Sequence, residues 1–149
     1  MSDPADIRGW QRLGAQVTTS GKLEPGDPAR LAAIGVCQVI NLALGDHPEA
    51  LAGEGALLGA HGIGYTHIPV PFDAPDKTHY AAFCAALDRS VGPVHVHCIM
   101  NYRVSAFFYR RNREQGMAEE EARRIMAAQW DPIASGRPET RVWAEFIAR

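Results

Sequence analysis

The sequence predicts an α/β fold, namely a single three-layer domain in which a mainly parallel central sheet is flanked by helices. The main observation is that short apolar runs rich in β-branched residues alternate with longer stretches of helical periodicity. Strands that alternate with helices are joined by crossover connections, which make successive strands parallel. The chain has 149 residues, 46% of them hydrophobic, and shows no repeat, low-complexity tract or linker. Residues 1–149 are therefore expected to form one domain around one core.

In the first half of the chain, Gly and Pro separate the expected strands from the expected helices. Asp27 is expected to be the N-cap of a helix that has Pro28 at its first position and ends at Gly35. The expected elements are one or two edge strands within residues 10–19, a helix over 27–34, a buried strand over 36–42, a helix that follows Pro48 and ends near Gly62, and a strand over 63–70.

The second half contains the longest helical patterns. Val94 and Val96 belong to a short apolar run, which suits a central strand covered on both faces. The segment 104–113 has its apolar residues first and arginines in its last turn, where cations are favourable against the helix dipole. The expected elements are a helix that Asp76 caps and that ends near Gly92, a strand that ends at His97, and helices over about 104–113, 118–130 and 138–148.

Cys98 lies between the end of that strand and the start of the next helix. The unpaired N–H groups in the first turn of a helix stabilise negative charge, which favours a thiolate. The same groups, together with Arg103, predict a receptor for an oxyanion. A thiolate beside such a receptor is equipped to attack phosphorus or sulfur. In a parallel sheet the ligand crevice lies at the carboxyl ends of the strands, where Cys98 falls.

The stretch from His97 to Ser105 resembles the signature of the cysteine-dependent protein tyrosine and dual-specificity phosphatase superfamily, and the chain is similar to its small bacterial members. That signature is a His-Cys pair, five intervening residues, an Arg, and then a Ser or Thr. His97, Cys98 and Ser105 match it. Only four residues separate Cys98 from Arg103, and Val104 occupies the position of the family's Arg. The resemblance covers most of the chain and implies the same fold.

The resemblance implies a phosphomonoester hydrolase that works through a cysteinyl-phosphate. Cys98 would attack the phosphorus, and Arg103 with the loop N–H groups would hold the phosphoryl oxygens. Ser105 would assist departure of the thiolate, and His97 would orient the loop backbone. The loop residues expected to line the substrate site are Ile99, Met100, Asn101, Tyr102 and Val104. Asn101 stands where the family often has Gly, and Asn tolerates the left-handed conformation that a tight loop demands.

The expected substrate is a phosphorylated protein or a small phosphomonoester, and a phosphate or sulfate ion is expected to fit the loop. The family supplies its general acid, an Asp, from the loop before the helix that leads to the motif strand. In this chain that loop holds Asp73 in its middle and Asp76 directly before the helix. A mid-loop carboxyl can swing over a pocket, whereas N-capping explains Asp76 fully. Asp73 is therefore the expected general acid, with Asp76 as the alternative.

Two other functions stay open. A six-residue loop from Cys98 to Arg103 resembles that of the rhodanese sulfurtransferases and implies a persulfide on the cysteine. The displaced Arg103 also leaves open a catalytically impaired pseudophosphatase that binds phosphate, because loss of one oxyanion contact lowers turnover by about 10²–10³.

Composition argues against several further classes of protein. A net charge of -2 is unlike a nucleic-acid-binding surface, and no apolar run is long enough to span a membrane. The histidines lack metal-ligand spacing, so neither a metal nor another cofactor is expected. Cys37 and Cys84 are expected to be small buried apolar residues. Unpaired cysteines and the lack of a secretory signal predict a cytoplasmic protein. The physiological substrate and the oligomeric state stay open.

Overall fold

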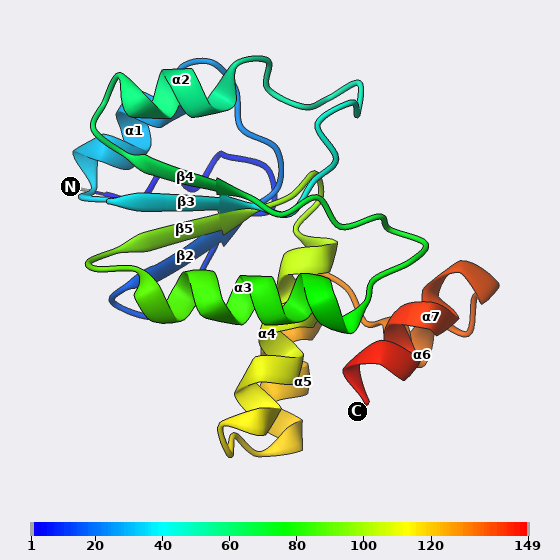
Figure 1. Cartoon of the computed structure of the whole chain (residues 1–149). Coiled ribbons are helices and arrows are strands. Elements are labelled where there is room, and N and C mark those ends of the chain that lie inside the picture. Colours follow the sequence, from blue (N-terminus) through cyan, green and yellow to red (C-terminus); the bar gives the residue numbers. More distant parts are fainter. Residues whose placement is uncertain (1, 149) are drawn as a thin grey trace.

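A five-stranded sheet with the strand order β1-β2-β5-β3-β4 forms the centre of the protein (Figure 1). The computed structural model describes residues 2–148. β1 pairs antiparallel with β2, and all the other pairs are parallel, so the predicted fold class is confirmed. The strands are β1 (Gln11–Arg12), β2 (Val17–Ser20), β3 (Gln38–Asn41), β4 (Gly64–His67) and β5 (Val94–His97).

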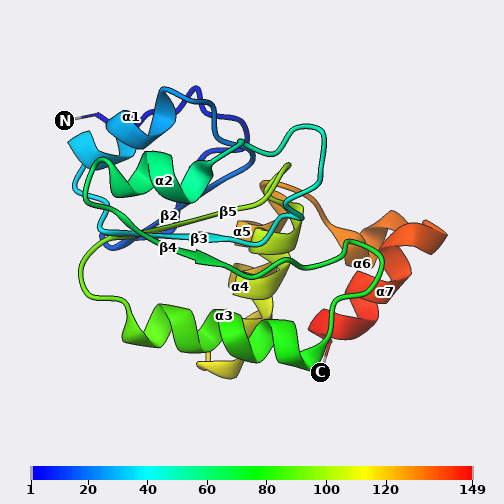
Figure 2. The same ribbon diagram turned by 45° about the horizontal axis from the view of Figure 1, so that its top comes forward.

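Helices cover both faces of this sheet. In Figures 1 and 2, α1 and α2 lie on one face, α3, α4 and α5 lie on the other, and α6 and α7 lie on the side to which the strands point. The helices are α1 (Asp27–Ala33), α2 (Glu54–Gly59), α3 (Lys77–Arg89), α4 (Tyr102–Glu114), α5 (Glu119–Ala127), α6 (Pro132–Ser135) and α7 (Pro138–Ile147). Among residues 2–148, none of the helices has the length and apolar character needed to cross a membrane.

Each face of the sheet has its own hydrophobic cluster. The larger cluster includes Phe83 of α3, Phe107 of α4 and Trp143 of α7, all fully buried. The smaller cluster joins Leu31 of α1 to Leu58 of α2. Full burial of one such side chain stabilises the fold by about 1.5–3 kcal/mol, so both layers of helices are held mainly by apolar contact.

Two predictions about the first segment need correction. β1 lies at the edge of the sheet, but β2 does not, because its backbone pairs with β1 on one side and with β5 on the other. The N-cap of α1 is Gly26, and Asp27 is the first helical residue; its carboxylate accepts a hydrogen bond from the N–H of Glu24 at 2.7 Å.

Three further details differ from the predictions. The helix expected after Pro48 begins only at Glu54, because the preceding Gly53 is left-handed with φ 66°. The short helix α6 has no counterpart among the expected elements. Cys37 is exposed rather than buried, because β3 begins one residue later and Cys37 lies outside the strand. Cys84 is only partly buried.

The order of the strands positions the residues that follow β5. β5 lies between β2 and β3, and its last residue, His97, is in register with Ser20 at the end of β2 and Asn41 at the end of β3. Cys98 therefore follows the carboxyl end of a central strand, as predicted, at the edge where parallel α/β proteins bind ligands.

Candidate active site

A tight loop connects β5 to α4 and begins with Cys98. Asn101 is the N-cap of α4 and has a left-handed backbone, with φ 68° and ψ 13°. In the part of the chain that the structure describes, no other residue except Gly has a positive φ. The expectation that Asn101 accepts the left-handed conformation of this loop is confirmed, since Asn carries a smaller penalty there than most side chains.

The Asn101 side chain ties the loop to the N-terminal segment. Asn101 is fully buried, and its Nδ2 donates to the carbonyl of Gly9 at 2.7 Å and to Oγ1 of Thr19 at 3.0 Å. The carbonyl of Ile99 accepts a hydrogen bond from the N–H of Lys22 at 2.9 Å. The loop is therefore held by segments about 80 to 90 residues earlier in the chain, as the sequence separations of 92 and 82 show.

The loop presents a run of backbone N–H groups that lack protein acceptors. The N–H of Cys98 donates to the carbonyl of Ser20 at 3.3 Å, and the N–H of Ser105 donates to the carbonyl of Asn101 at 3.1 Å. Between them, the N–H groups of residues 99–104 have no acceptor within residues 2–148. A curved run of free N–H groups at the N-terminus of a helix is a receptor for an anion.

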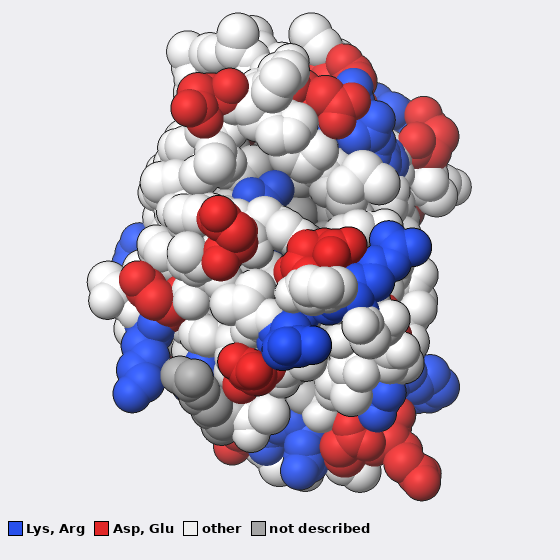
Figure 3. Space-filling model, turned by 90° about the vertical axis from the view of Figure 1, so that its right-hand side faces the viewer, with Lys and Arg blue, Asp and Glu red and all other residues white. Residues whose placement is uncertain are grey.

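Cys98 lies at the base of this run, and its side chain is fully buried. Figure 3 shows the face of the molecule to which the strands point. Cationic atoms there lie in a hollow between uncharged side chains, with acidic side chains on the surrounding surface. The loop itself is mostly covered: Ile99 is buried, Tyr102 is partly buried, and Met100 is 42% exposed.

Arg103 is turned into the protein and is only 7% exposed. Its Nη1 donates to the carbonyl of Val70 at 2.9 Å, and its Cζ lies 6.0 Å from the centre of the Phe72 ring. Its Nε is buried and has no partner among the described residues. The guanidinium thus connects the loop after β5 to the segment after β4, and its Nε and Nη2 atoms have no acceptor among residues 2–148.

Val104 lies where the resemblance would place the arginine. It is fully buried and belongs to the larger hydrophobic cluster. Because α4 begins at Tyr102, residues 103 and 104 leave the helix in directions about 100° apart. Val104 therefore faces the core, and the cation beside the loop is Arg103.

His97 is held by two acceptors. Its Nε2 lies 2.6 Å from Oε2 of Glu54, and its Nδ1 lies 3.1 Å from the carbonyl oxygen of Cys98. Both side chains of the His97–Glu54 pair are almost fully buried, at 3% and 4% exposure. Sequence reasoning missed Glu54, which lies 43 residues before His97 at the start of α2.

His95 is a core histidine. Its ring nitrogens lie 2.8 Å from Oγ1 of Thr18 and 2.8 Å from Oγ of Ser20. The ring stacks on Trp10 with centroids 5.2 Å apart. Complete burial lowers the pKa of His95 well below its ordinary value, and the neighbouring His97 adds to this effect.

Ser105 and Tyr102 make local contacts in this structure. Oγ of Ser105 donates to the carbonyl of Tyr102 at 3.2 Å, a bond within the first turn of α4. The Tyr102 ring stacks on Trp130, with centroids 4.8 Å apart and an interplanar angle of 10°. The indole N–H of Trp130 donates to the same Tyr102 carbonyl at 2.8 Å, so the residues before α6 support the loop.

The structure gives Asp73 and Asp76 different surroundings. Asp76 is the N-cap of α3: its carboxylate accepts from the N–H of His79 at 3.0 Å, and the His79 ring accepts from the N–H of Asp76 at 3.2 Å. Asp73 is exposed and has no hydrogen bond or ion pair with the rest of residues 2–148. The capping role expected for Asp76 is confirmed, and Asp73 is free to act on a ligand.

The segment that carries Asp73 is anchored at two residues that precede it, Val70 and Phe72. The carbonyl of Val70 accepts from Arg103, and the carbonyl of Phe72 accepts from the indole N–H of Trp143 at 2.6 Å. The Phe72 ring packs between Trp130 and Trp143, with centroids 5.6 and 5.7 Å away. The sequence predicted this loop and the helix over 138–148, but not the contact between them.

No group of His, Cys, Asp and Glu side chains within residues 2–148 has the arrangement of a metal site. The candidate site offers a buried thiol, a run of amide N–H groups and one guanidinium, and the segment before α3 carries the exposed carboxyl of Asp73.

Comparison with known proteins gives structural matches. No family model matches the sequence, and no curated protein matches it. A DUF442 protein from Shewanella putrefaciens, provisionally assigned as a phosphatase, is 29% identical, with a TM-score of 0.82 over 98% of this chain and 95% of that one.

More distant solved structures share the fold. TpbA of P. aeruginosa, in complex with pTyr, is 18% identical, with a TM-score of 0.69 over 100% of this chain and 94% of that one. The catalytic core of the PP-IP phosphatase SIW14 from S. cerevisiae is 13% identical, with a TM-score of 0.73 over 95% and 86% of the two chains.

Proposed function

We propose that this chain, which by its fold belongs to the protein tyrosine and dual-specificity phosphatase-like superfamily, is a phosphomonoester hydrolase that works through a cysteinyl-phosphate on Cys98. The observation that carries the proposal is the run of free N–H groups over residues 99–104, which curves from a cysteine into the N-terminus of a helix. Such a run matches the equatorial oxygens of a phosphoryl group, whose charge rises in the transition state.

Each residue has a defined part in the proposed reaction. The Cys98 thiolate attacks phosphorus, and the bond from phosphorus to the ester oxygen breaks. Asp73 gives its proton to that leaving oxygen. Water then attacks the phosphoryl group, inorganic phosphate leaves, and the thiolate is regenerated with help from the Ser105 hydroxyl.

Arg103 acts through the N–H group that the protein leaves free. Its Nε is buried without a partner, while Nη1 is held by the Val70 carbonyl. A buried donor without an acceptor is costly, and a phosphoryl oxygen removes that cost. His97, held between Glu54 and the Cys98 carbonyl, orients the backbone at the start of the loop.

The proposed substrate is a phosphorylated protein or a small phosphomonoester. The resemblance in fold to TpbA, which was crystallised with pTyr, supports this class of substrate. Ile99, Met100, Asn101, Tyr102 and Val104 supply the N–H groups that contact the phosphoryl oxygens.

A second candidate is a protein that binds phosphoryl groups without hydrolysing them. The observation that favours it is the placement of Val104, which stands in the core where the superfamily's signature has an arginine. The Nη1 atom of Arg103 is already engaged with the Val70 carbonyl, so its guanidinium offers fewer N–H groups to an oxyanion than an unbonded arginine would. Fewer oxyanion contacts mean less stabilisation of the transition state.

Turnover and binding are measured separately to distinguish these two functions. We expect the wild-type chain to hydrolyse an aryl phosphate, Cys98→Ser to lose hydrolysis entirely while still binding inorganic phosphate, and Arg103→Met to lose about 10²-fold or more in kcat/KM. Isothermal titration with inorganic phosphate reports binding. Arg124→Met, a change to an exposed arginine of α5, is the matched control and should retain both properties.

The outcomes separate the candidates. Phosphate binding without hydrolysis by the wild-type chain rejects the enzyme and supports the second candidate. Hydrolysis that persists in Cys98→Ser rejects the covalent route. Transfer of sulfur from thiosulfate to cyanide that requires Cys98, without phosphate release, supports the sulfurtransferase alternative instead.

A further inference from the structure

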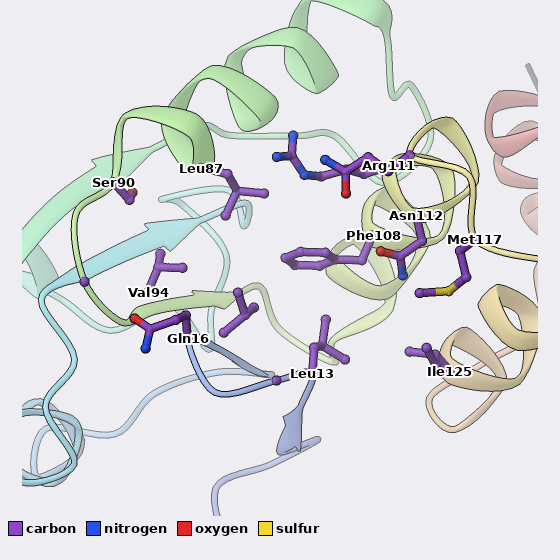
Figure 4. A pocket seen from close by; sticks show the side chains of 14 residues that line it. Leu13, Gln16, Leu87, Ser90, Val94, Phe108, Arg111, Asn112, Met117 and Ile125 are labelled. Carbon is purple, nitrogen blue, oxygen red and sulfur yellow. The ribbon is translucent and has the colours of Figure 1, made fainter.

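A cavity of about 490 Å³ lies at the end of the sheet opposite Cys98 (Figure 4). It is bounded by the β1–β2 hairpin, the end of α3, the start of β5, and one side of α4 and α5. Val17 and Val94, which line it, are the first residues of β2 and β5, whereas Cys98 follows the last residue of β5. The cavity is thus distinct from the candidate active site.

The lining of the cavity is apolar at its centre. In Figure 4 the Phe108 ring projects across the middle, and aliphatic side chains surround it. The apolar lining of the cavity includes Leu13, Val17, Leu87, Val94, Phe108 and Ile125. A concave apolar site of a few hundred Å³ with a few polar groups is the usual form of a small-molecule site.

One charged side chain, Arg111, lines the cavity, and its fourteen lining residues include no carboxylate. Figure 4 shows the Arg111 guanidinium beside Leu87 at one side of the cavity. Its Nη2 donates to Oδ1 of Asp88 at 2.7 Å; the Arg111 side chain is 18% exposed, and that of Asp88 is 67% exposed. The carboxylate thus engages one edge of the guanidinium from solvent, where water screens it.

We propose that this cavity binds a small carboxylate with an apolar body, whose chain or ring lies against Phe108 and whose carboxylate pairs with Arg111. The choice of ligand rests on charge complementarity. The residues that line the cavity include one cation and no anion, so an anionic end group should bind more tightly than a neutral one, and a cationic end group more weakly. The amide of Gln115, which lines the cavity one helical turn after Arg111, can hydrogen-bond to the remaining carboxylate lone pairs. The proposal is independent of the proposed hydrolase activity.

Three probes with the same apolar chain, octanoate, octanol and octylammonium, test whether the cavity prefers an anionic end group. Titration calorimetry of the full chain should show saturable binding that is tightest for octanoate and weakest for octylammonium. Arg111→Met keeps the apolar stem and should weaken octanoate binding about tenfold or more while leaving octanol binding unchanged. Arg124→Met, at an exposed arginine outside the cavity, should change neither.

Two further variants test the location. Gln16 is an exposed residue of the β1–β2 hairpin, and its side chain lines the cavity. In Gln16→Trp the larger indole can fill the cavity without disturbing the core, so binding of all three probes should be lost. Asp88→Asn frees the guanidinium and should tighten octanoate binding. Circular dichroism confirms that each variant is folded. The absence of saturable octanoate binding, equal binding of octanoate and octylammonium, or full binding by folded Gln16→Trp would overturn the proposal.

Discussion

Buried polar side chains surround the loop after β5, and nearly all of them have partners. His95 is bonded to Thr18 and Ser20, and His97 is bonded to Glu54. Among the described residues, the buried side-chain atoms without a hydrogen bond are Oδ1 of Asn101 and Nε of Arg103, and both belong to this loop. Because unpaired buried groups are costly, their concentration at one place indicates that a ligand or water completes them.

His95 predicts how stability depends on pH. Burial holds its pKa well below the ordinary value, so the folded chain keeps the ring neutral while the unfolded chain takes up a proton below about pH 6.5. The free energy of unfolding is therefore greatest above about pH 6.5 and falls as the pH is lowered, by up to about 1.4 kcal/mol per pH unit from this group. Urea denaturation between about pH 7 and pH 5 measures this slope, which should be shallower in His95→Gln. Equal slopes in the two proteins would contradict the prediction.

Gly21 lies against the loop after β5 at a position where a side chain would not fit. A Cβ at this position would lie 2.4 Å from the carbonyl oxygen of Ile99, which is backbone and cannot rotate away. Gly21→Ala should lower the free energy of unfolding by about 1–3 kcal/mol and weaken phosphate binding, because the loop must move.

Gly14→Ala is the matched control for Gly21→Ala. A Cβ at Gly14 meets nothing within 4 Å, so this variant should keep both stability and phosphate binding. Urea denaturation and calorimetric titration with phosphate compare the two. Indistinguishable results from the two variants would show that the loop tolerates the added methyl group.

At the scale of secondary-structure elements, the segment between β4 and α3 is positioned partly by local hydrogen bonds and partly by contacts with distant elements. Asp76 and His79 form a reciprocal capping box three residues apart, a pattern that depends only on nearby backbone. The position of Asp73 instead depends on Arg103 and Trp143, which reach the segment from α4 and α7. The position of Asp76 is thus set by local secondary structure, whereas that of Asp73, three residues earlier, is set by tertiary contacts.

Paired substitutions distinguish the two carboxyls. Asp76→Ala should lower the free energy of unfolding by about 1 kcal/mol, because α3 loses its cap, and should reduce kcat only slightly. Asp73→Asn should leave stability unchanged, since Asp73 is exposed without partners, and should lower kcat by about 10²–10⁴. Chemical denaturation and steady-state kinetics with an aryl phosphate test both. A larger loss of kcat in Asp76→Ala would assign the general acid to Asp76.

At the scale of the whole molecule, Trp130 and α7 pack against the loop after β5 and the segment that carries Asp73. Trp143 of α7 is fully buried and bonds to the Phe72 carbonyl, while Trp130, just before α6, bonds to the Tyr102 carbonyl. The two indoles lie 6.1 Å apart and enclose the Phe72 ring. The C-terminal part of the chain therefore holds both the loop after β5 and the segment that carries Asp73.

Trp143→Phe tests this coupling. It keeps most of the apolar volume but removes the bond to Phe72, so the free energy of unfolding should fall by about 1–3 kcal/mol and kcat should fall with it. Tyr109→Phe is the matched control, because it removes a bond from Tyr109 to Glu119 away from the loop and should cost stability without affecting kcat. Unchanged kcat in Trp143→Phe would show that α7 supports the core only.

The sequence alone was enough to predict the alternation of strands and helices, the mainly parallel sheet, Cys98 at the end of a central strand, the capping role of Asp76 and the left-handed Asn101. These features depend on side-chain periodicity and on backbone preferences within a few residues, so the local amino-acid sequence is enough to predict them. The catalytic parts assigned to Cys98, Arg103, Asp73, Ser105 and His97 stay predictions.

Only the tertiary structure decided that Glu54 meets His97, that Arg103 rather than residue 104 lies beside the loop, that Gly21 must lack a side chain, and that α7 anchors Phe72. The partners in these contacts are separated by 43 residues for Glu54 and His97, and by 33 and 71 for the bonds to Val70 and Phe72. No local pattern encodes such pairs, because they form only when the packing of the sheet and helices brings distant segments together.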